Sequence, residues 1–202
     1  MFIEQPPHII RKLYPEALWR MDVAKKVVYL TFDDGPIPEI TSWVLDLLNK
    51  YDVKATFFMV GENVCKYPEI YQMVVNCGHR IGNHTYNHIR GSGYLSKNYL
   101  ANIEKANKLL KTGLFRPPYG FMRRVQYLML KNPYKIVMWD LVTRDYSNKL
   151  HPQQVLQNVK KYVRNGSIIT FHDSLKAEKN MKYALPRSIE WIKDQGYEFG
   201  LL

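Results

Sequence analysis

The sequence predicts an α/β fold in which a parallel sheet or barrel is flanked by helices. Short apolar runs rich in β-branched residues alternate with amphipathic stretches at intervals of about 25 to 35 residues, which is the pattern of βαβ units. The chain has 202 residues, the usual size of one domain. We therefore expect a single domain spanning residues 1–202, in which residues 1–25 form an N-terminal extension.

Seven strands are expected from the apolar runs, and four helices from apolar residues that recur at helical spacing. The strands are expected at residues 26–32, 55–60, 80–83, 115–116, 135–139, 167–172 and 198–202. The helical stripes are Ile40, Val44, Leu47 and Leu48; Leu100, Ile103 and Leu110, after a Ser96 cap; Val155, Val159, Tyr162 and Val163; and Leu185, Ile189 and Ile192. Such stripes are typical of a core face. Seven strands with intervening helices are one unit short of the eight-unit (β/α) barrel.

The composition indicates a soluble globular protein with an excess of positive charge. Hydrophobic residues make up 46% and charged residues 23%, and no apolar run is long enough to span a bilayer. The 29 Lys and Arg residues outnumber the 18 Asp and Glu residues, which gives a net charge of +11. This excess favours an anionic partner, such as an acidic polymer or a phospholipid surface, or alternatively serves solubility, because the basic residues are spread along the chain. No nucleic-acid partner is expected, because no nucleic-acid-binding motif is present.

The cysteines and the N-terminus give weaker expectations. Cys65 and Cys77 do not form a C-x-x-C pair, so the sequence gives no support for thioredoxin chemistry or a cysteine zinc cage. Two buried thiols are expected, with one disulfide as the alternative. Residues 1–7 lack the features of a secretory signal, so a cytoplasmic location is expected, or an extracytoplasmic one if the chain is a mature or truncated form. His8, His79 and His151 are expected to be surface or capping residues.

Polar, reactive residues follow the ends of five predicted strands, and such ends converge on one rim of a (β/α) barrel. Asp33 and Asp34 follow the first strand, where adjacent carboxylates can serve as a base and as a metal ligand. His84 and His88 follow the third strand, and a helical turn brings residues at this spacing to one ion. On its own the pair is better explained by surface histidines. The upstream carboxylates favour a metal, because two His and one carboxylate form a catalytic site with open positions.

Three further strand ends add to this rim. Arg116 precedes two prolines that fix the backbone, so its side chain can hold a catalytic carboxylate and its turn can present an N–H group to an oxyanion. The segment 140–145 follows the fifth strand. His172 ends the sixth, where a general acid can protonate a leaving amine. Each motif alone also suits an ordinary polar turn, and their combination favours catalysis.

These motifs, in this order, resemble those of the polysaccharide deacetylases with NodB homology, carbohydrate esterase family 4. The motifs are Thr-Phe-Asp-Asp-Gly-Pro at 31–36, His-Thr-Tyr-Asn-His at 84–88, Arg-Pro-Pro-Tyr-Gly at 116–120, and the fourth and fifth at Asp145 and His172. The likeness runs from residue 27 to residue 202. It implies a distorted (β/α)7 barrel of the NodB type and a divalent metal, zinc first, with cobalt or another transition ion as the alternative.

The resemblance also implies a role for each motif residue. The implied metal ligands are Asp34, His84 and His88. The implied catalytic residues are Asp33 as general base, Arg116 holding Asp33, Tyr119 giving a backbone N–H group to the oxyanion, His172 as general acid, and Asp145 tuning His172. The implied substrate-binding residues are Pro117, Tyr146 and Thr170.

Two positions depart from the family pattern. Tyr146 stands where the family has tryptophan after the aspartate, and Thr170 stands where a leucine lines the pocket for the acetyl methyl group. Threonine is close in size to valine but adds a hydroxyl, so we expect a more polar and roomier acyl pocket. The complete set of metal ligands argues against an inactive homologue.

The expected activity is metal-dependent hydrolysis of the amide bond in an N-acetylated glycan, such as a chitin oligosaccharide or a peptidoglycan-like polymer, with release of acetate. An O-acetyl esterase acting on a glycan and a non-catalytic basic module that binds a glycan are the alternatives. The expected partner is the carbohydrate itself. The positive charge favours an anionic substrate and peripheral membrane contact, and the sequence carries no signal for an oligomeric state.

Overall fold

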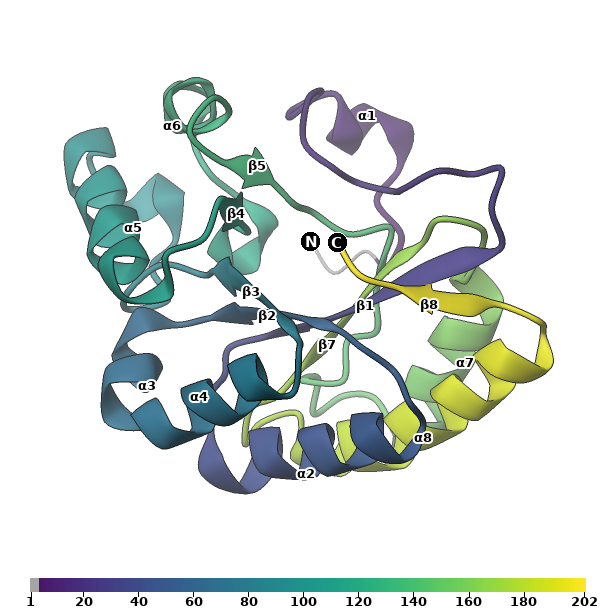
Figure 1. The fold of residues 1–202 in the computed structure, drawn as a ribbon. Coiled ribbons are helices and arrows are strands. Elements are labelled where there is room, and N and C mark those ends of the chain that lie inside the picture. Colours follow the sequence, from purple (N-terminus) through teal and green to yellow (C-terminus); the bar gives the residue numbers. More distant parts are fainter. Residues whose placement is uncertain (1–3) are drawn as a thin grey trace.

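The computed structural model describes residues 4–202 and contains one curved sheet, with strands in the order β5-β4-β3-β2-β1-β7-β6 and β8 paired to β1 (Figure 1). Every pairing between these strands is parallel. The strands are β1 (Val27–Asp33), β2 (Thr56–Met59), β3 (Arg80–Asn83), β4 (Leu114–Phe115), β5 (Lys135–Ile136), β6 (Leu141–Val142), β7 (Ile168–His172) and β8 (Glu198–Gly200). The sheet forms a half-barrel with helices, which confirms the distorted (β/α)7 barrel.

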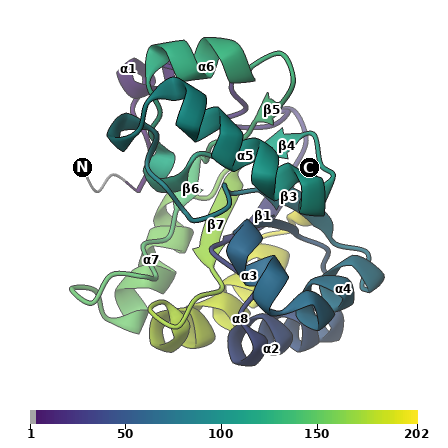
Figure 2. The ribbon, with the colours of Figure 1, turned by 90° about the vertical axis from the view of Figure 1, so that its left-hand side faces the viewer.

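Helices lie on both sides of the sheet. They are α1 (His8–Arg11), α2 (Pro38–Lys50), α3 (Gly61–Lys66), α4 (Pro68–Asn76), α5 (Ser96–Leu110), α6 (Arg124–Leu130), α7 (Pro152–Tyr162) and α8 (Glu178–Asp194), with short 3-10 turns at Gly91–Gly93 and Pro118–Gly120. In Figures 1 and 2, α2, α4 and α8 lie below the sheet, whereas α1, α5 and α6 lie above it. Within residues 4–202, no helix is long and apolar enough to cross a membrane.

The core explains why the central strands are apolar along their whole length. All five residues of β7 are buried, and β1 is buried at Val28 and from Leu30 to Asp33. Strands covered on both faces read as continuous apolar runs rather than alternating ones. Phe32 of β1 stacks on Phe57 of β2 with ring centroids 4.9 Å apart. This packing holds β1 in place between its neighbouring strands. It therefore positions Asp33 and Asp34 at the carboxyl end of β1.

The N-terminal segment bridges strands that lie far apart in the sheet order. Leu18 forms a parallel bridge with Val137 after β5, and Arg20 forms an antiparallel bridge with Ser167 before β7. Asp140 is fully buried beside Ser167 and accepts ion pairs from Arg11 and Arg164, each at 2.6 Å. Asp140 therefore fastens the N-terminal segment and does not join the reactive rim with Asp145. The boundary of the extension at residue 25 stays a prediction.

Several local expectations were wrong for identifiable reasons. The strand β6 was not expected, because two apolar residues between Asp140 and Thr143 show no periodicity. Ser96 is the first residue of α5 rather than its cap, since Leu95 holds that position without a side-chain hydrogen bond. The short helices α3, α4 and α6 were also not expected.

The cysteines and one histidine also differ from expectation. Cys65 and Cys77 are exposed and free, because they lie on the solvent side of α3 and at the end of α4. His79 is buried rather than superficial, and its Nδ1 accepts the N–H of Ala55 at 3.2 Å. Burial lowers the pKa of His79 to about 4, so it is a neutral structural group. His8 is exposed and His151 caps α7, as expected.

Candidate active site

Three potential metal ligands meet at the carboxyl ends of β1 and β3. Asp34 Oδ1 lies 3.2 Å from His88 Nε2 and 3.8 Å from His84 Nε2. One ligand atom of each residue lies within 4.8 Å of the others. Two imidazole nitrogens and one carboxylate oxygen suit a divalent transition ion and leave coordination positions open. The chemistry of this donor set therefore fits a catalytic metal.

The protonation of these groups also suits a cation. His84 Nδ1 donates to the carbonyl of Arg116 at 2.8 Å, which leaves the Nε2 lone pair directed at Asp34. Burial lowers the pKa of His84 to about 4, with the charges of His88 and Arg116 adding to this effect. Burial works against ionisation of Asp34, but the hydrogen bond with His88 and the charges of His172 and His84 hold its pKa well below the usual range. At neutral pH the site offers a neutral imidazole and a carboxylate.

The backbone that presents these ligands is not the helical turn expected for residues 84–88. Thr85 and His88 have left-handed φ values of 66° and 53°, and Asp34 has 83°. Asn83 stabilises the turn by accepting the N–H of Thr85 at 2.8 Å. A left-handed residue other than glycine is uncommon and often marks a functional site. The two histidines converge through these reversals of the loop.

Arg116 lies beneath the site and holds Asp33. Its Nη1 forms a 2.6 Å ion pair with Asp33 Oδ1, and both side chains are almost completely buried. The guanidinium also donates to the carbonyls of Val137 and Met138 at 3.3 and 2.9 Å. It lies over the ring of Phe58 at 4.1 Å. Burial lowers the pKa of Arg116, and the Asp33 carboxylate opposes that effect. The pairing that sequence motifs implied between Arg116 and Asp33 is present.

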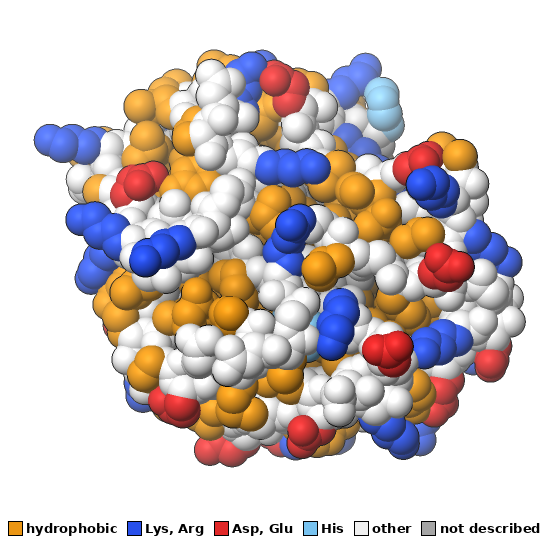
Figure 3. Space-filling model, in the orientation of Figure 1, with side chains coloured by type: hydrophobic (Ala, Val, Ile, Leu, Met, Phe, Trp, Pro, Cys, Tyr) orange, Lys and Arg blue, Asp and Glu red, His pale blue; other side chains and the backbone are white. Residues whose placement is uncertain are grey.

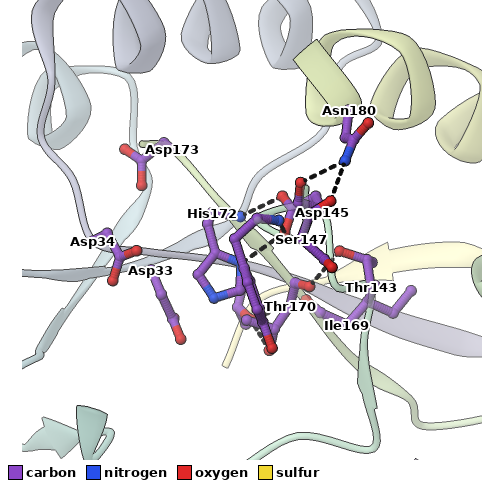
Figure 4. A network of polar contacts seen from close by, with 12 residues as sticks. Asp33, Asp34, Thr143, Asp145, Ser147, Ile169, Thr170, His172, Asp173 and Asn180 are labelled. Carbon is purple, nitrogen blue, oxygen red and sulfur yellow. Dashed lines mark hydrogen bonds and ion pairs between the residues drawn. The ribbon is translucent and has the colours of Figure 1, made fainter. Parts of the chain in front are cut away.

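Thr170 belongs to the same buried network. Arg116 Nη1 also donates to Thr31 Oγ1 at 2.9 Å. Thr31 gives its one hydroxyl proton to the carbonyl of Ile169 at 2.9 Å, so Thr170 donates to Thr31 Oγ1 at 3.2 Å. The Thr170 hydroxyl, which was expected to make the acyl pocket more polar, is therefore occupied by Thr31. Figure 4 shows Thr170 below His172 in this network.

His172 is the last residue of β7, and Asp145 holds it through two hydrogen bonds. The Asp145 carboxylate accepts the backbone N–H of His172 through Oδ2 and the ring Nδ1–H through Oδ1, both at 2.8 Å. Burial opposes a charge on His172, but Asp145, with Asp34 and Asp33, raises the pKa to about 9. Figure 4 shows Asp145 on one side of His172 and the Asp33-Asp34 pair on the other. His172 is therefore a protonated group facing two carboxylates.

The remaining sequence-predicted residues surround this centre. The ring of Tyr146 meets the ring of His172 edge-on at 4.7 Å. Tyr119 is two-thirds exposed, has a left-handed φ of 60°, and places its ring 4.8 Å from that of His88. Pro117 is buried and its carbonyl accepts the N–H of Gly120, which closes the turn that carries Tyr119. All eleven residues predicted for the site thus lie at or directly beneath one rim.

Asp173 is a site residue to which no motif in the sequence assigns a role. Its Oδ1 accepts the N–H of Gly35 at 3.1 Å and its Oδ2 accepts the hydroxyl of Thr41 at 2.6 Å. Its own N–H donates to the carbonyl of Asp33 at 3.1 Å. A Cβ at position 35 would lie 2.0 Å from the Asp173 carboxylate, so only glycine fits there. Asp173 therefore clamps the turn that carries Asp33 and Asp34.

Two signals in the sequence point to this clamp and its surroundings. Thr41 is a polar residue on the apolar stripe of α2, between Ile40 and Val44, and such a residue needs a buried partner. Asn180 likewise stands on the buried face of α8. Its amide donates to the carbonyl of Asp145 at 2.9 Å and fixes the loop that carries this carboxylate (Figure 4).

We expect the chain to bind one divalent transition ion at the Asp34-His84-His88 site. His84→Ala should weaken the affinity for Co²⁺ or Zn²⁺ by more than about 100-fold, because loss of a hydrogen bond supporting a ligand alone costs about 10- to 100-fold. Isothermal titration calorimetry on the chelated protein measures this affinity. The exposed His8→Ala variant is the control. Equal affinity in the His84→Ala variant would contradict the assignment.

We expect Asp173→Ala to loosen the turn at Gly35. Loss of the two hydrogen bonds should lower the free energy of unfolding by about 1–3 kcal/mol. It should also weaken Co²⁺ binding about 10-fold. Asp173→Asn keeps an acceptor for Gly35 and should restore most of the affinity. Denaturant unfolding and the cobalt absorption spectrum report the two effects, with the exposed Asp46→Ala as control. Unchanged affinity in Asp173→Ala would show that the clamp does not position the ligands.

Comparison with known proteins gives close relatives over almost the whole chain. The family model for polysaccharide deacetylase matches residues 20–137. A peptidoglycan-N-acetylglucosamine deacetylase of Bacillus cereus is 33% identical over 189 residues, which are 90% of this chain and 88% of that protein. The peptidoglycan-N-acetylmuramic acid deacetylase PdaC of Bacillus subtilis is 29% identical over 96% of this chain and 41% of that protein.

Solved structures agree with the sequence relatives. A peptidoglycan N-acetylglucosamine deacetylase crystallised with an N-oxidanyl-benzamide has a TM-score of 0.90 and 32% identity, over 98% of this chain and 95% of that one. A pseudoenzyme of carbohydrate esterase family 4 from Bacillus anthracis has a TM-score of 0.83 and 28% identity, over 93% and 68%. The fold therefore occurs with and without activity, and the side chains decide between them. By fold, motifs and relatives together, this chain belongs to the polysaccharide deacetylase family, carbohydrate esterase family 4.

Proposed function

We propose that this protein is a metal-dependent deacetylase that hydrolyses the amide bond of N-acetylated sugars in a glycan and releases acetate. The observation that carries the proposal is the meeting of three units at one rim. These units are the Asp33–Arg116 ion pair, the Asp34-His84-His88 cluster and the His172–Asp145 pair. A base, a cation site and an acid are the groups that amide hydrolysis requires.

The substrate class follows from the relatives and from charge. The two peptidoglycan deacetylases described above favour a peptidoglycan-like polymer of N-acetylated sugars, with chitin oligosaccharides as a simpler substrate of the same chemistry. The net charge of +11 favours an anionic glycan over a neutral one.

Each residue of the candidate site has its own role in the proposed hydrolysis. When bound, a divalent ion, zinc first, supplies Lewis-acid polarisation and makes a water molecule more acidic. Asp33 takes a proton from the attacking water, and Arg116 keeps that carboxylate oriented. The backbone N–H of Tyr119 stabilises the negative charge on the acetyl oxygen. His172 gives its Nε2 proton to the leaving sugar nitrogen, since Asp145 holds Nδ1.

In this proposal, the acetyl group of the substrate binds between His172, Tyr146 and Tyr119. Tyr146 covers one face of this space through its edge-on contact with His172. The ring of Tyr119 lies 4.8 Å from that of the metal-ligand candidate His88. Because the Thr170 hydroxyl is hydrogen-bonded to Thr31 and the residue is buried, Thr170 adds no free polar group to this space.

We expect metal-dependent release of acetate from N-acetyl-chitooligosaccharides or peptidoglycan fragments after chelation and reloading with Zn²⁺ or Co²⁺. Asp33→Asn should lower kcat by about 100- to 10,000-fold, because it removes the base while keeping the shape. Asp46→Asn, on the exposed face of α2, is the control. Release from O-acetyl esters alone would favour the esterase alternative. Binding of glycans without any release would favour a non-catalytic module.

We expect the alkaline limb of the kcat profile to report His172. The raised pKa keeps this group protonated at neutral pH, and the proton is lost as the pH rises through about 9. The same shift stabilises the fold, fully below the ordinary value of 6.5 and not at all above about 9. Asp145→Asn should move the alkaline limb to lower pH, which a pH–rate profile and an imidazole NMR titration measure. An unmoved limb would exclude His172 as the acid.

A further inference from the structure

One end of the molecule, away from the lower helices, exposes a group of large aliphatic side chains. Ile9 and Leu13 lie at α1, and Val125, Leu128 and Met129 lie on α6, with exposed fractions between 45% and 75%. We call this group, with the basic residues around it, the α1–α6 surface. Aliphatic side chains scattered singly are normal, but five on two neighbouring helices form a patch.

The hydrogen bonds show that this surface is continuous. Arg124 of α6 donates to the carbonyl of Leu13 at 3.0 Å. Arg123, at the start of α6, donates to the carbonyl of Ser92 at 2.9 Å. Helix α6 therefore lies between the end of α1 and the loop at residues 91–95. Both helices lie at the top of the molecule in Figures 1 and 2, and Figure 2 shows α1 beside α6.

The charge of this surface is strongly one-sided. The three segments that form it, residues 8–16, 89–100 and 119–131, contain one acidic residue, Glu16, and seven basic residues: Arg11, Lys12, Arg90, Lys97, Arg123, Arg124 and Lys131. Arg11 forms an ion pair with Asp140, and Lys131 forms one with Glu16 at 2.6 Å. In Figure 3, hydrophobic and basic side chains lie together along this upper edge. With seven basic residues and one acidic residue, these segments carry +6 of the chain's net charge of +11 beside the exposed aliphatic groups.

We propose that the α1–α6 surface docks on an anionic phospholipid membrane. Exposed aliphatic side chains enter the boundary of the acyl chains, while lysine and arginine contact the phosphate groups. A second copy of the chain fits this surface poorly, because a two-fold contact would place basic residues against basic residues. A glycan would stack on the exposed rings of Tyr94 and Phe121 in the flanking segments, and it leaves the aliphatic chains of Leu128 and Met129 without a partner.

The position of the surface connects it to the catalytic rim. The guanidinium of Arg90, two residues after His88, lies 5.6 Å from the ring of Phe121. Phe121 follows the turn that carries Tyr119. Docking would therefore hold the rim close to the bilayer. The inference does not depend on catalysis, because binding to vesicles is measured without any turnover.

The test is cosedimentation of the full chain with vesicles of phosphatidylcholine alone and of equal parts phosphatidylcholine and phosphatidylglycerol. We expect binding to the anionic vesicles that weakens with added salt, and little binding to the neutral ones. Leu128→Ser with Met129→Ser, and separately Lys12→Glu with Lys97→Glu, should each weaken binding by at least about 10-fold.

Matched controls make the same changes elsewhere. Met73→Ser with Val75→Ser alters two exposed apolar residues of α4, and Lys160→Glu with Lys161→Glu alters two exposed lysines of α7. Both should bind as the parent chain does, and circular dichroism checks that every variant is folded. Absence of binding to anionic vesicles would overturn the proposal, as would equal losses in patch and control variants. Dimerisation in sedimentation that Leu128→Ser with Met129→Ser abolishes would assign the surface to a second copy instead.

Discussion

The buried guanidinium of Arg116 is the interaction on which the rest of the site depends. A cation removed from water is tolerated only when it is paired and hydrogen-bonded, and removing one partner of such a pair costs about 3–5 kcal/mol. Arg116 meets this demand with Asp33, Thr31 and two backbone carbonyls, and its own carbonyl accepts Nδ1–H of His84. One residue therefore orients a base and a metal ligand that come from different strands. The two prolines after it keep the backbone rigid while it does so.

The parallel sheet supplies the other constraint, because its central strands decide which side chains can meet. β1 and β7 run in register from Tyr29 to Asp33, with Asp33 opposite His172. The residues that follow these two strand ends, Asp34 and Asp173, thus emerge side by side. The Asp173 carboxylate accepts the N–H of Gly35. This hydrogen bond connects the turn that carries Asp34 to the end of the strand that carries His172. Neither element can shift without moving the other.

The residue types of the candidate site could be predicted from the sequence, but the backbone conformation that brings them together could not. The meeting of the Asp33-Asp34 pair with His88 could be predicted because each motif stands directly after an apolar strand, and parallel strand ends converge. The choice of Asp34 as the ligand and Asp33 as the base came from the resemblance to the family. The conformation of the loop at Thr85 could not be predicted, because left-handed φ values in residues other than glycine leave no sequence pattern. Strand β6 was missed because two residues are too few for periodicity. The part played by Asp173 required knowledge of which atoms face Gly35, which only the packed structure gives.

The contrast between two histidines at one rim shows how the fold separates their roles. His84 and His172 are both buried, and burial alone lowers the pKa of each. At His84 burial is the largest effect, and the pKa falls to about 4, because Asp33 and Asp34 raise it while His88 and Arg116 lower it. At His172 the hydrogen-bonded Asp145, with Asp34 and Asp33, outweighs burial and raises the pKa to about 9. Since both rings are buried, the difference between the ligand and the proton donor comes mainly from the Asp145 carboxylate on His172. Within a family that includes a pseudoenzyme, this opposition of charges is a stronger argument for activity than the fold itself.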